Sequence, residues 1–336
     1  MPITIGSQTI GGAGGGVPTT RTIAGLDLSQ DRSAAAMKTA LAIASSDVSG
    51  LGANGSGTYA ARPATPAAGD TYLVTSGQRM GSLYHCRVAG QWLLVDIKTG
   101  LADSAIYDVE NVPASGSLRW WPPVRSNRNA APATVVSGYV GPWVLNGSLG
   151  GMSALGFGAT VAEANTFLRA DALAAGLGSD KSIVLALSGW NTGVNNGVIA
   201  LGSAASTAAS VGIFTCFPGS GYADVGVEYE GGATSFYRSG NTVTVGSGIH
   251  TIIWTWDSGA STSRLYIDGA PAATPTQVPT APRGVLARQS VLTIGAGRTS
   301  LGGTFDGKLH GIAIVDSRLS DANAAAFHTF YAARFS

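Results

Sequence analysis

The feature that most constrains the fold is a long series of short strand-like runs between residues 119 and 336. Roughly twelve such runs, rich in β-branched and aromatic residues, are separated by turn signals built from glycine, serine and asparagine. Glycine accounts for 48 of the 336 residues and charged residues for only 12%. Many short strands joined by tight turns are typical of a β-sandwich. We therefore expect a mainly β protein whose C-terminal part is a β-sandwich.

One strand pair in this region carries two tryptophans, in the stretch IHTIIWTWDSGASTSRLYIDGAP at positions 249–271. Side chains alternate along a strand, so Ile252, Trp254 and Trp256 share one face. Such a face most often points into the core, because a buried aromatic ring removes a large apolar area from water. The pattern predicts that both tryptophans are core residues. An exposed pair that stacks on a sugar is the alternative.

A helix is expected at the end of the chain. Ser320 is a good N-cap, Asp321 favours the positive end of the helix dipole, and the helical run covers Ala324–Ala333. A second short helix is expected at Ala170–Ala175.

The N-terminal third has a different organisation. Met37, Ala40, Leu41 and Ala44 fall on one helical face, and GANGSG at 52–57 is a flexible joint. The runs TYLVT, SLYHCRV and QWLLVDI then predict a small meander of strands. The expected parts are an anchoring arm at 1–20, a short helix and joint at 21–55, the β-meander at 56–97, a linker at 98–118 and the sandwich domain at 119–336.

Composition excludes several classes of partner. The net charge is +1 with arginine scattered along the chain, which argues against nucleic-acid binding. No run of 18 apolar residues exists, so we expect no membrane insertion, and the start lacks the features of a secretory signal. Cys86 and Cys216 lie in different expected domains, so we expect no disulfide and synthesis in a reducing cytoplasm.

The C-terminal region resembles concanavalin A-like (laminin-G-like) jelly rolls. The stretch at 249–271 is similar to the family's strands "WHHVAVTYDG" and "LRLYVDGV", and DKSIVLALSGW is similar to "FTISAWV". SVLTIGAGRTSLGGTFDGKLHGIAIVDSRLS resembles "LTIGG" followed by "F-x-G-x-I-x-x-V-x-I-Y-x-R-x-L-S". The residues at matching places are Phe305, Gly307, Leu309, Ile312, Ile314, Leu319 and Ser320. The resemblance implies a jelly-roll fold at about 170–330; it says little about chemistry, because these are core and turn positions.

The N-terminal region resembles adaptor segments of tailed-phage fibres and of related phage-like particles. The similar stretches are TIAGLDLSQDRSAAAMKTAL and SGTYAARPATPAAGDTYLVTSGQRMGSLYHCRVAGQWLL. This resemblance implies a virion surface protein that docks on a capsid or tail protein through its N-terminal arm. It also implies a homotrimer with a receptor-binding domain at the far end.

Carboxylates are the side chains on which glycan cleavage would depend. Asp224, Glu228 and Glu230 share one face of the strand YADVGVEYE, on which neighbouring carboxyl groups are about 6–7 Å apart along the strand. Glycoside hydrolysis uses two carboxyl groups at comparable separations. The glucanase pattern Glu-x-Asp-x-x-Glu is absent, however, and a polar strand face is ordinarily the solvated side. We expect no catalytic residues.

Other chemistry leaves no signature either. No nucleophilic triad, metal-binding spacing or phosphate loop is evident in the sequence, and a lone histidine in a strand is more often packed than catalytic. We expect no metal and no cofactor.

Glycan recognition needs aromatic faces and fixed polar groups, usually on loops. The stretch GWNTGVNNG offers an aromatic ring beside amides, which both donate and accept hydrogen bonds. The full set of candidates is Trp190, Asn191, Asn195, Asn196, Tyr222, Asp224, Glu228, Glu230, Tyr237 and Arg238. For each of them a turn or packing role is the alternative.

These observations lead to one main hypothesis and two alternatives. The main hypothesis is a structural virion fibre or spike whose jelly roll binds host-surface polysaccharide. The first alternative is a fibre-borne glycan depolymerase that uses the carboxylates at 224–230. The second is a decoration protein of the capsid or tail without a ligand.

Overall fold

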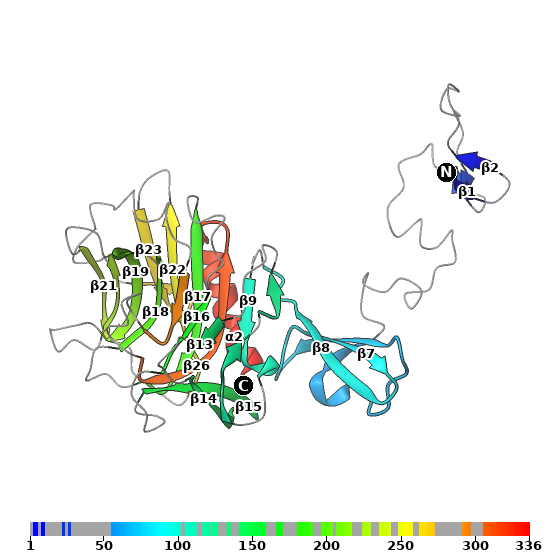
Figure 1. Cartoon of the computed structure of the whole chain (residues 1–336), viewed down its shortest axis with the longest axis horizontal. Helices are drawn as coiled ribbons and strands as arrows, with labels where there is room; N and C mark the ends of the chain where they lie inside the picture. The colour runs from blue at the N-terminus through cyan, green and yellow to red at the C-terminus, as the bar shows by residue number, and fades with distance from the viewer. Residues whose placement is uncertain are drawn as a thin grey trace.

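The structure is a computed structural model of the chain. It describes residues 3–5, 8–10, 22–23, 26–27, 55–101, 105–112, 116–121, 123–126, 133–135, 141–158, 166–170, 180–190, 196–203, 206–216, 224–229, 235–242, 248–257, 262–272, 291–296 and 305–336. The described elements form a small β-module and a larger β-sandwich that lies beside it (Figure 1).

The small module is a four-stranded sheet in the order β5-β6-β7-β8. Its strands are β5 (Gly55–Thr58), β6 (Thr71–Ser76), β7 (Ser82–Val88) and β8 (Gln91–Ile97). β5 runs parallel to β6, and the remaining pairs are antiparallel. The three predicted runs are therefore strands. One face of the sheet buries a small cluster of Tyr72, Val74 and Tyr84, against which Tyr59 and Trp92 pack.

The sandwich contains two sheets. One has ten strands, with the main order β10-β14-β15-β26-β17-β22-β23-β24. Its strands are β9 (Ala105–Asp108), β10 (Gly116–Ser117), β12 (Arg125–Ser126), β14 (Trp143–Leu149), β15 (Met152–Phe157), β17 (Lys181–Ser188), β22 (His250–Asp257), β23 (Thr262–Ile267), β24 (Ala270–Pro271) and β26 (Gly307–Val315).

The other sheet has eight strands, in the order β11-β13-β16-β25-β18-β19-β20-β21. They are β11 (Trp120–Trp121), β13 (Ala133–Val135), β16 (Leu168–Ala170), β25 (Val291–Ile294), β18 (Asn196–Ser203), β19 (Ser206–Cys216), β20 (Asp224–Tyr229) and β21 (Ser235–Thr242). Buried residues of both sheets form one continuous hydrophobic cluster. The mainly β fold and the C-terminal sandwich are as predicted.

The region 98–118 differs from the expected linker. Its strand β9 pairs with β26 in the middle of the ten-stranded sheet, where Tyr107 lies opposite Ile312. All four residues of β9 are buried. A strand covered on both faces has no alternation of apolar and polar residues, which is why the sequence pattern did not reveal it. The sandwich therefore begins before residue 119.

Trp254 and Trp256 are core residues, as predicted. They are 0% and 3% exposed, and Ile252 on the same face is also buried. The opposite face of β22 is buried too, because Thr251 on that face contacts His328 of the helix α2 (Asp321–Arg334). The tryptophans therefore face the interior between the two sheets.

Helix α2 covers the outer face of the ten-stranded sheet (Figure 1). It begins where the sequence predicted: the Ser320 side chain accepts a hydrogen bond from the Asn323 amide at 3.2 Å. Ala324, Phe327, Phe330 and Tyr331 of the helix are buried. The apolar face of α2 therefore closes a layer over the sheet.

Several predictions fall on other parts of the chain. The predicted helical face at Met37–Ala44 and residues 171–175 of the second predicted helix lie outside the described residues. Near the start, β1 (Ile3–Ile5) pairs with β2 (Gln8–Ile10), and β3 (Thr22–Ile23) with β4 (Leu26–Asp27). Within the described ranges no helix is long and apolar enough to cross a membrane.

Candidate functional site

Four of the predicted glycan-contacting residues lie on the last two strands of the eight-stranded sheet. Asp224 and Glu228 belong to β20, and Tyr237 and Arg238 belong to β21. The pairing sets position 238 across from Gly226, so positions 228 and 238 are diagonal neighbours of one strand pair. The structure thus places all four positions on the two strands at one edge of the sheet, with position 237 on the opposite face from position 238.

The remaining candidates sit at the connection between the two sheets or beyond the described residues. Asn196 is the first residue of β18, where it pairs with Cys216. Trp190 lies two residues after the end of β17, so 190 and 196 bracket a connection from the ten-stranded sheet to the eight-stranded one. Asn191, Asn195, Tyr222 and Glu230 lie outside the described residues.

Trp190 is packed inside the protein. Its side chain is only 4% exposed, and its ring meets the His250 ring edge-on, with 5.2 Å between the centroids. The indole Nε1 is buried and has no hydrogen-bond partner among the described residues. In this arrangement the ring lies in the packing and does not present an open face for stacking on a sugar.

A polar cluster that the sequence did not reveal lies beside Trp190. Asp268 accepts a hydrogen bond from the Thr251 amide at 2.9 Å, and its other carboxylate oxygen lies 2.9 Å from His250 Nδ1. His328 of α2 approaches the same carboxylate at 3.9 Å. Burial alone would raise the pKa of Asp268, but these partners outweigh it and hold the pKa below its ordinary value.

The conformation of Asp268 explains how the turn supports this cluster. Its φ is +50° and that of the following Gly269 is +78°, so two successive residues are in the left-handed region. Asp and Gly tolerate that region better than most residues. The Asp-Gly pair after LYI was the available sequence signal for a turn, but the contacts with His250 and His328 come from other elements. The cluster fastens the β22–β23 hairpin to α2.

A larger polar network joins the small module to the sandwich. Arg334 of α2 is fully buried and forms a bidentate ion pair with Asp108 of β9, with N–O distances of 2.9 and 3.0 Å. It also donates to Glu110 at 2.7 Å. Its remaining donors reach the module: the carbonyls of Arg79 and Met80 and the Ser82 hydroxyl.

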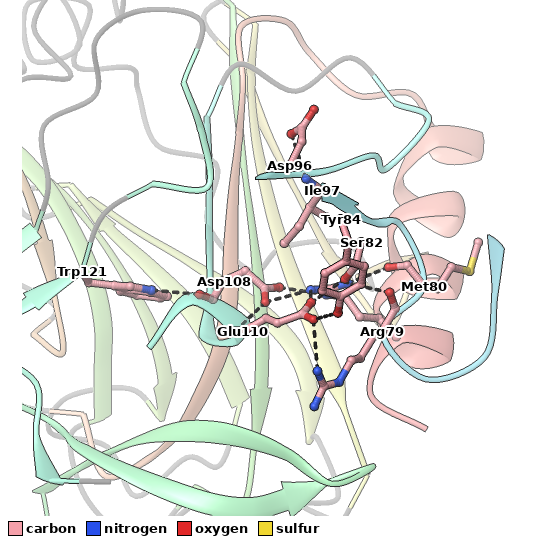
Figure 2. A network of polar contacts seen from close by, with 10 residues as sticks. Arg79, Met80, Ser82, Tyr84, Asp96, Ile97, Asp108, Glu110 and Trp121 are labelled. Carbon is pink, nitrogen blue, oxygen red and sulfur yellow. Dashed lines mark hydrogen bonds and ion pairs between the residues drawn. The ribbon is translucent and has the colours of Figure 1, made fainter. Parts of the chain in front are cut away.

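Glu110 is the second centre of this network. Figure 2 shows its carboxylate between Arg79, Ser82 and Tyr84, all three of which belong to the small module. Trp121 contributes from the sandwich side by donating to the Asp108 carbonyl at 3.1 Å. The guanidinium group of Arg334 and two carboxylates therefore hold four segments of chain at one buried point.

The contacts within the network favour an ionised Glu110, a protonated Tyr84 and a charged Arg334. Burial would raise the pKa of Glu110, but Arg334, the two hydroxyl donors and Arg79 together lower it. Burial and the charge of Glu110 raise the pKa of the Tyr84 phenol, which stays protonated and donates. Burial opposes the charge on Arg334, yet the two carboxylates raise its pKa above the ordinary value. Because the network is buried, we assign it the structural role of holding the small module against the sandwich, and no role in catalysis.

Ser188 and His310 form another buried polar contact, with 2.8 Å between Oγ and Nε2. The Phe335 ring packs on the imidazole at 5.0 Å. Burial and then the positive charge of Lys308 lower the pKa of His310 to about 3, although the Ser153 backbone acts in the opposite direction. A buried, neutral imidazole without access to solvent is a packing residue, so this pair is not a nucleophile and its base.

The part of the chain that the structure describes contains no group of three or more His, Cys, Asp or Glu side chains able to hold a metal ion. Cys86 is a free, buried thiol, whose sulfur lies 3.0 Å from the Val88 carbonyl oxygen.

Comparison with known proteins identifies the domain. Residues 190–325 match the family described as the concanavalin A-like lectin/glucanases superfamily. The match covers less than half of the chain, and it falls within the two-sheet sandwich. The C-terminal region is therefore a concanavalin A-like jelly-roll domain, as the sequence motifs predicted. No curated protein matches the chain.

Several solved structures are similar in part. The NanB sialidase of Streptococcus pneumoniae is 17% identical with a TM-score of 0.37, over 44% of this chain and 23% of the sialidase. The CBM40 of the Ruminococcus gnavus IT-sialidase, bound to α2,3 sialyllactose, is 16% identical with a TM-score of 0.36, over 45% and 83% of the two chains. A SAP-like pentraxin from Limulus polyphemus is 10% identical with a TM-score of 0.33, over 44% and 68%.

The match covers 23% of the NanB sialidase and 34% of a Trypanosoma rangeli sialidase, so this chain spans about a quarter to a third of these sialidases. At these levels of similarity the solved structures bear on neither the activity nor the ligand of this chain.

Proposed function

We propose that the protein binds carbohydrate through its concanavalin A-like domain. The observation that carries this proposal is the match of residues 190–325 to a family named for lectins and glucanases, in a region that forms the two-sheet sandwich. Recognition of a small ligand uses apolar and aromatic surface with a few precisely placed polar groups that fix its orientation. The proposal is one of binding without hydrolysis.

The proposed binding region is the end of the eight-stranded sheet that carries β20 and β21. Two observations support this choice. Glu228 and Arg238 stand at diagonal positions of one strand pair, and β21 is the last strand of its sheet. A carboxylate and a guanidinium group on neighbouring strands are suited to several hydroxyls of one sugar, because one accepts and the other donates hydrogen bonds.

We further propose that this binding attaches a virion fibre or spike to host-surface polysaccharide. The support is the resemblance of the segments near the start and at 56–94 to phage-fibre adaptors. On this proposal the N-terminal arm docks on a capsid or tail protein, and many copies on one particle multiply weak sugar contacts by avidity. The homotrimer implied by the resemblance stays a prediction.

The test uses the full chain, because the buried contacts of Arg334 with the small module argue against cutting the module away. Labelled protein is mixed with candidate host cells before and after removal of their surface polysaccharide. We expect binding that disappears with the polysaccharide. We also expect the double variant Glu228→Gln and Arg238→Gln to bind at least about tenfold more weakly.

Two controls sharpen the result. Arg264→Gln changes an exposed arginine of the other sheet, so it should bind like the wild type. Release of reducing sugar from the polysaccharide would support the depolymerase alternative instead. No binding to any host, with the protein folded, would contradict the proposal and favour the decoration protein.

A further inference from the structure

Arg62 lies at the centre of an aromatic cluster on the small module. Its guanidinium carbon is 4.5 Å from the centre of the Tyr59 ring, 4.3 Å from that of Tyr84 and 5.8 Å from that of Trp92. The guanidinium group is planar and weakly hydrated, so it packs favourably on aromatic faces. Three rings around one guanidinium group therefore hold it in one orientation.

The backbone that carries Arg62 is fixed as well. Tyr59–Ala61 form a single 3₁₀ turn, and the Arg62 amide donates to the Tyr59 carbonyl at 3.3 Å. Pro63 follows and restricts the residue before it to extended backbone, which Arg62 adopts with φ −62° and ψ 132°. The indole of Trp92 donates to the Pro63 carbonyl at 2.8 Å and so ties the turn to β8. Backbone and side chain are both preorganised, which lowers the entropy cost of binding a ligand.

The positive charge of Arg62 is not paired with a carboxylate among the described residues. Arg79 and Arg334 supply two positive charges to the neighbouring junction network, whose two carboxylates balance them. The module itself contains two acids. Asp70 accepts a hydrogen bond from a backbone amide three residues away, and Asp96 forms an ion pair with a lysine two residues away. Arg62 is therefore the surplus cation of this part of the protein.

Most hydrogen-bond donors of the Arg62 side chain have no acceptor among the described residues. A guanidinium group has five N–H bonds. Within the described part of the chain this one makes a single hydrogen bond, from Nη2 to the Tyr59 hydroxyl at 3.1 Å. Arg62, Tyr59 and Trp92 are all half-buried, so each retains contact with solvent. The Tyr59 hydroxyl keeps its own proton and is able to donate it to the same ligand. Such a set of donors is suited to an anion with two oxygens.

We propose that Arg62 and the rings around it bind the carboxylate of an acidic sugar in a polysaccharide. The planar fork of arginine matches the two oxygens of a carboxylate. The half-buried rings of Tyr59 and Trp92 offer apolar surface to the C–H face of a sugar ring, which the acidic side chains of a protein ligand lack. The inference rests on the proposed function, because the ligand is again a polysaccharide. It adds a contact on the small module, whereas the strands proposed above belong to the sandwich.

The test compares a short oligogalacturonate with the same oligosaccharide after methyl esterification of its carboxyl groups. Esterification removes the charge of the ligand and leaves the protein unchanged, so folding does not affect the comparison. We expect the full-length wild type to bind the charged form at least about tenfold more tightly in isothermal titration calorimetry. Absence of binding, or equal affinities for the two forms, would overturn the proposal. So would tighter binding of inorganic phosphate or of a short glutamate peptide.

Variants of Arg62 test whether this residue is responsible. Arg62→Gln should abolish the preference for the charged form, because glutamine removes the cation. Arg62→Lys retains the charge without the planar fork, and it should bind the charged form at least about fivefold more weakly than the wild type. Circular dichroism establishes that each variant is folded.

Arg87→Gln is the matched control. It removes an exposed positive charge from β7 of the same module, at a side chain that contacts no aromatic ring in the described structure. It should bind both forms like the wild type. Equal losses in Arg87→Gln and Arg62→Gln would indicate general attraction between charges and would contradict a site at Arg62.

The double variant Glu228→Gln and Arg238→Gln separates this inference from the proposed function. It should keep the preference for the charged oligosaccharide while its binding to host cells is weakened. Loss of the preference in this variant would assign the acidic sugar to the sandwich and overturn the inference. A wild type that prefers the charged form but binds no host cell would contradict the proposed function alone.

Discussion

At the scale of single residues, Arg334 is the buried cation that joins the small module to the sandwich. Its guanidinium group is buried with Asp108 and Glu110, and neither carboxylate is more than slightly exposed. A buried ion pair contributes little compared with a well-packed apolar pair, but removing one partner leaves an uncompensated charge in the interior. The network therefore makes the junction of the module and the sandwich sensitive to changes at one residue.

We expect Arg334→Met to lower the free energy of unfolding by about 3–5 kcal/mol, because the buried Asp108 carboxylate loses its cation and Glu110 retains only Arg79. Urea unfolding at neutral pH measures the change. The control is Arg264→Met, which breaks an ion pair with Asp321 in which both side chains are about half exposed. Its cost should be about 1 kcal/mol or less. Equal effects of the two substitutions would contradict the role given to the network.

The lowered pKa of His310 leads us to expect that the stability of the protein depends on pH. Its pKa is about 3 in the folded protein and its ordinary value is 6.5, so between these values the unfolded chain binds a proton that the folded protein does not. Stability should therefore fall as the pH drops from about 6.5 towards 3, by up to about 1.4 kcal/mol per pH unit. His310→Gln, which retains a polar group toward Ser188, should flatten the decline between pH 6.5 and 4.5.

Glu110 affects the free energy of unfolding at a lower pH than most of the effect of His310, so the two contributions can be distinguished. Its pKa in the folded protein is below the ordinary value of 4.5, so its contribution to stability is present above that pH and is lost as the pH falls below it. Glu110→Gln should leave the slope above pH 4.5 unchanged and reduce the slope below it. Unfolding midpoints measured from pH 7 to pH 3 test both statements. If the His310→Gln variant kept the wild-type slope of stability against pH above pH 4.5, the low pKa given to His310 would be contradicted.

At the scale of elements, helix α2 holds the small module and the sandwich together. Besides Arg334, the helix contributes Phe330, whose ring packs close to Gly81 at the start of β7. Gly81 has a φ of +85°, and a Cβ there would lie 2.6 Å from the Lys98 carbonyl oxygen and 2.8 Å from Phe330 Cε2. Only glycine fits this close approach of strand and helix.

Gly81→Ala should therefore destabilise the junction, whereas Gly90→Ala provides a matched control. Gly90 has the same φ of +85°, but nothing lies within 4 Å of its missing Cβ. The control should cost about 1 kcal/mol for the left-handed backbone alone. Gly81→Ala adds the collision with Phe330 and should cost at least about 2 kcal/mol. Thermal unfolding measures both, and equal costs would show that the helix contact is unimportant.

The elements were predictable where their residues carry a local pattern. The strands of the small module and the strand of Trp254 alternate, and the helix after Ser320 has its cap in the sequence. The strand β9 was not predictable, because all four of its residues are buried and its partner β26 lies some 200 residues later in the chain. A local sequence pattern does not indicate pairing with a strand so distant in the chain.

At the scale of the whole molecule, the proposed sugar-binding strands lie away from the junction of the small module and the sandwich. β20 and β21 end the eight-stranded sheet, whereas Arg334 joins the two parts on the side of the module (Figure 1). If the proposed fibre role holds, many copies on one particle multiply weak contacts with a polysaccharide.

The candidate site was predictable in part. The alternation in YADVGVEYE placed Asp224 and Glu228 on one strand, and SFYRSG placed Arg238 on another; the pairing that makes 228 and 238 neighbours came from the structure. The sequence also suggested Trp190 as an open aromatic residue beside amides. Its burial against His250 depends on a strand that lies about 60 residues further along, so the local pattern could not indicate it.

By itself, the sequence determined the mainly β class, the jelly-roll motifs, the three strands of the module and the cap of the last helix. Each of these depends on residues within a few positions of one another. Tertiary structure alone decided that β9 completes the sandwich, that α2 covers a sheet and that Arg334 meets Asp108, 226 residues earlier in the chain. The physical reason is that burial and charge pairing depend on distance in space, and only the folded chain brings these groups within reach of one another.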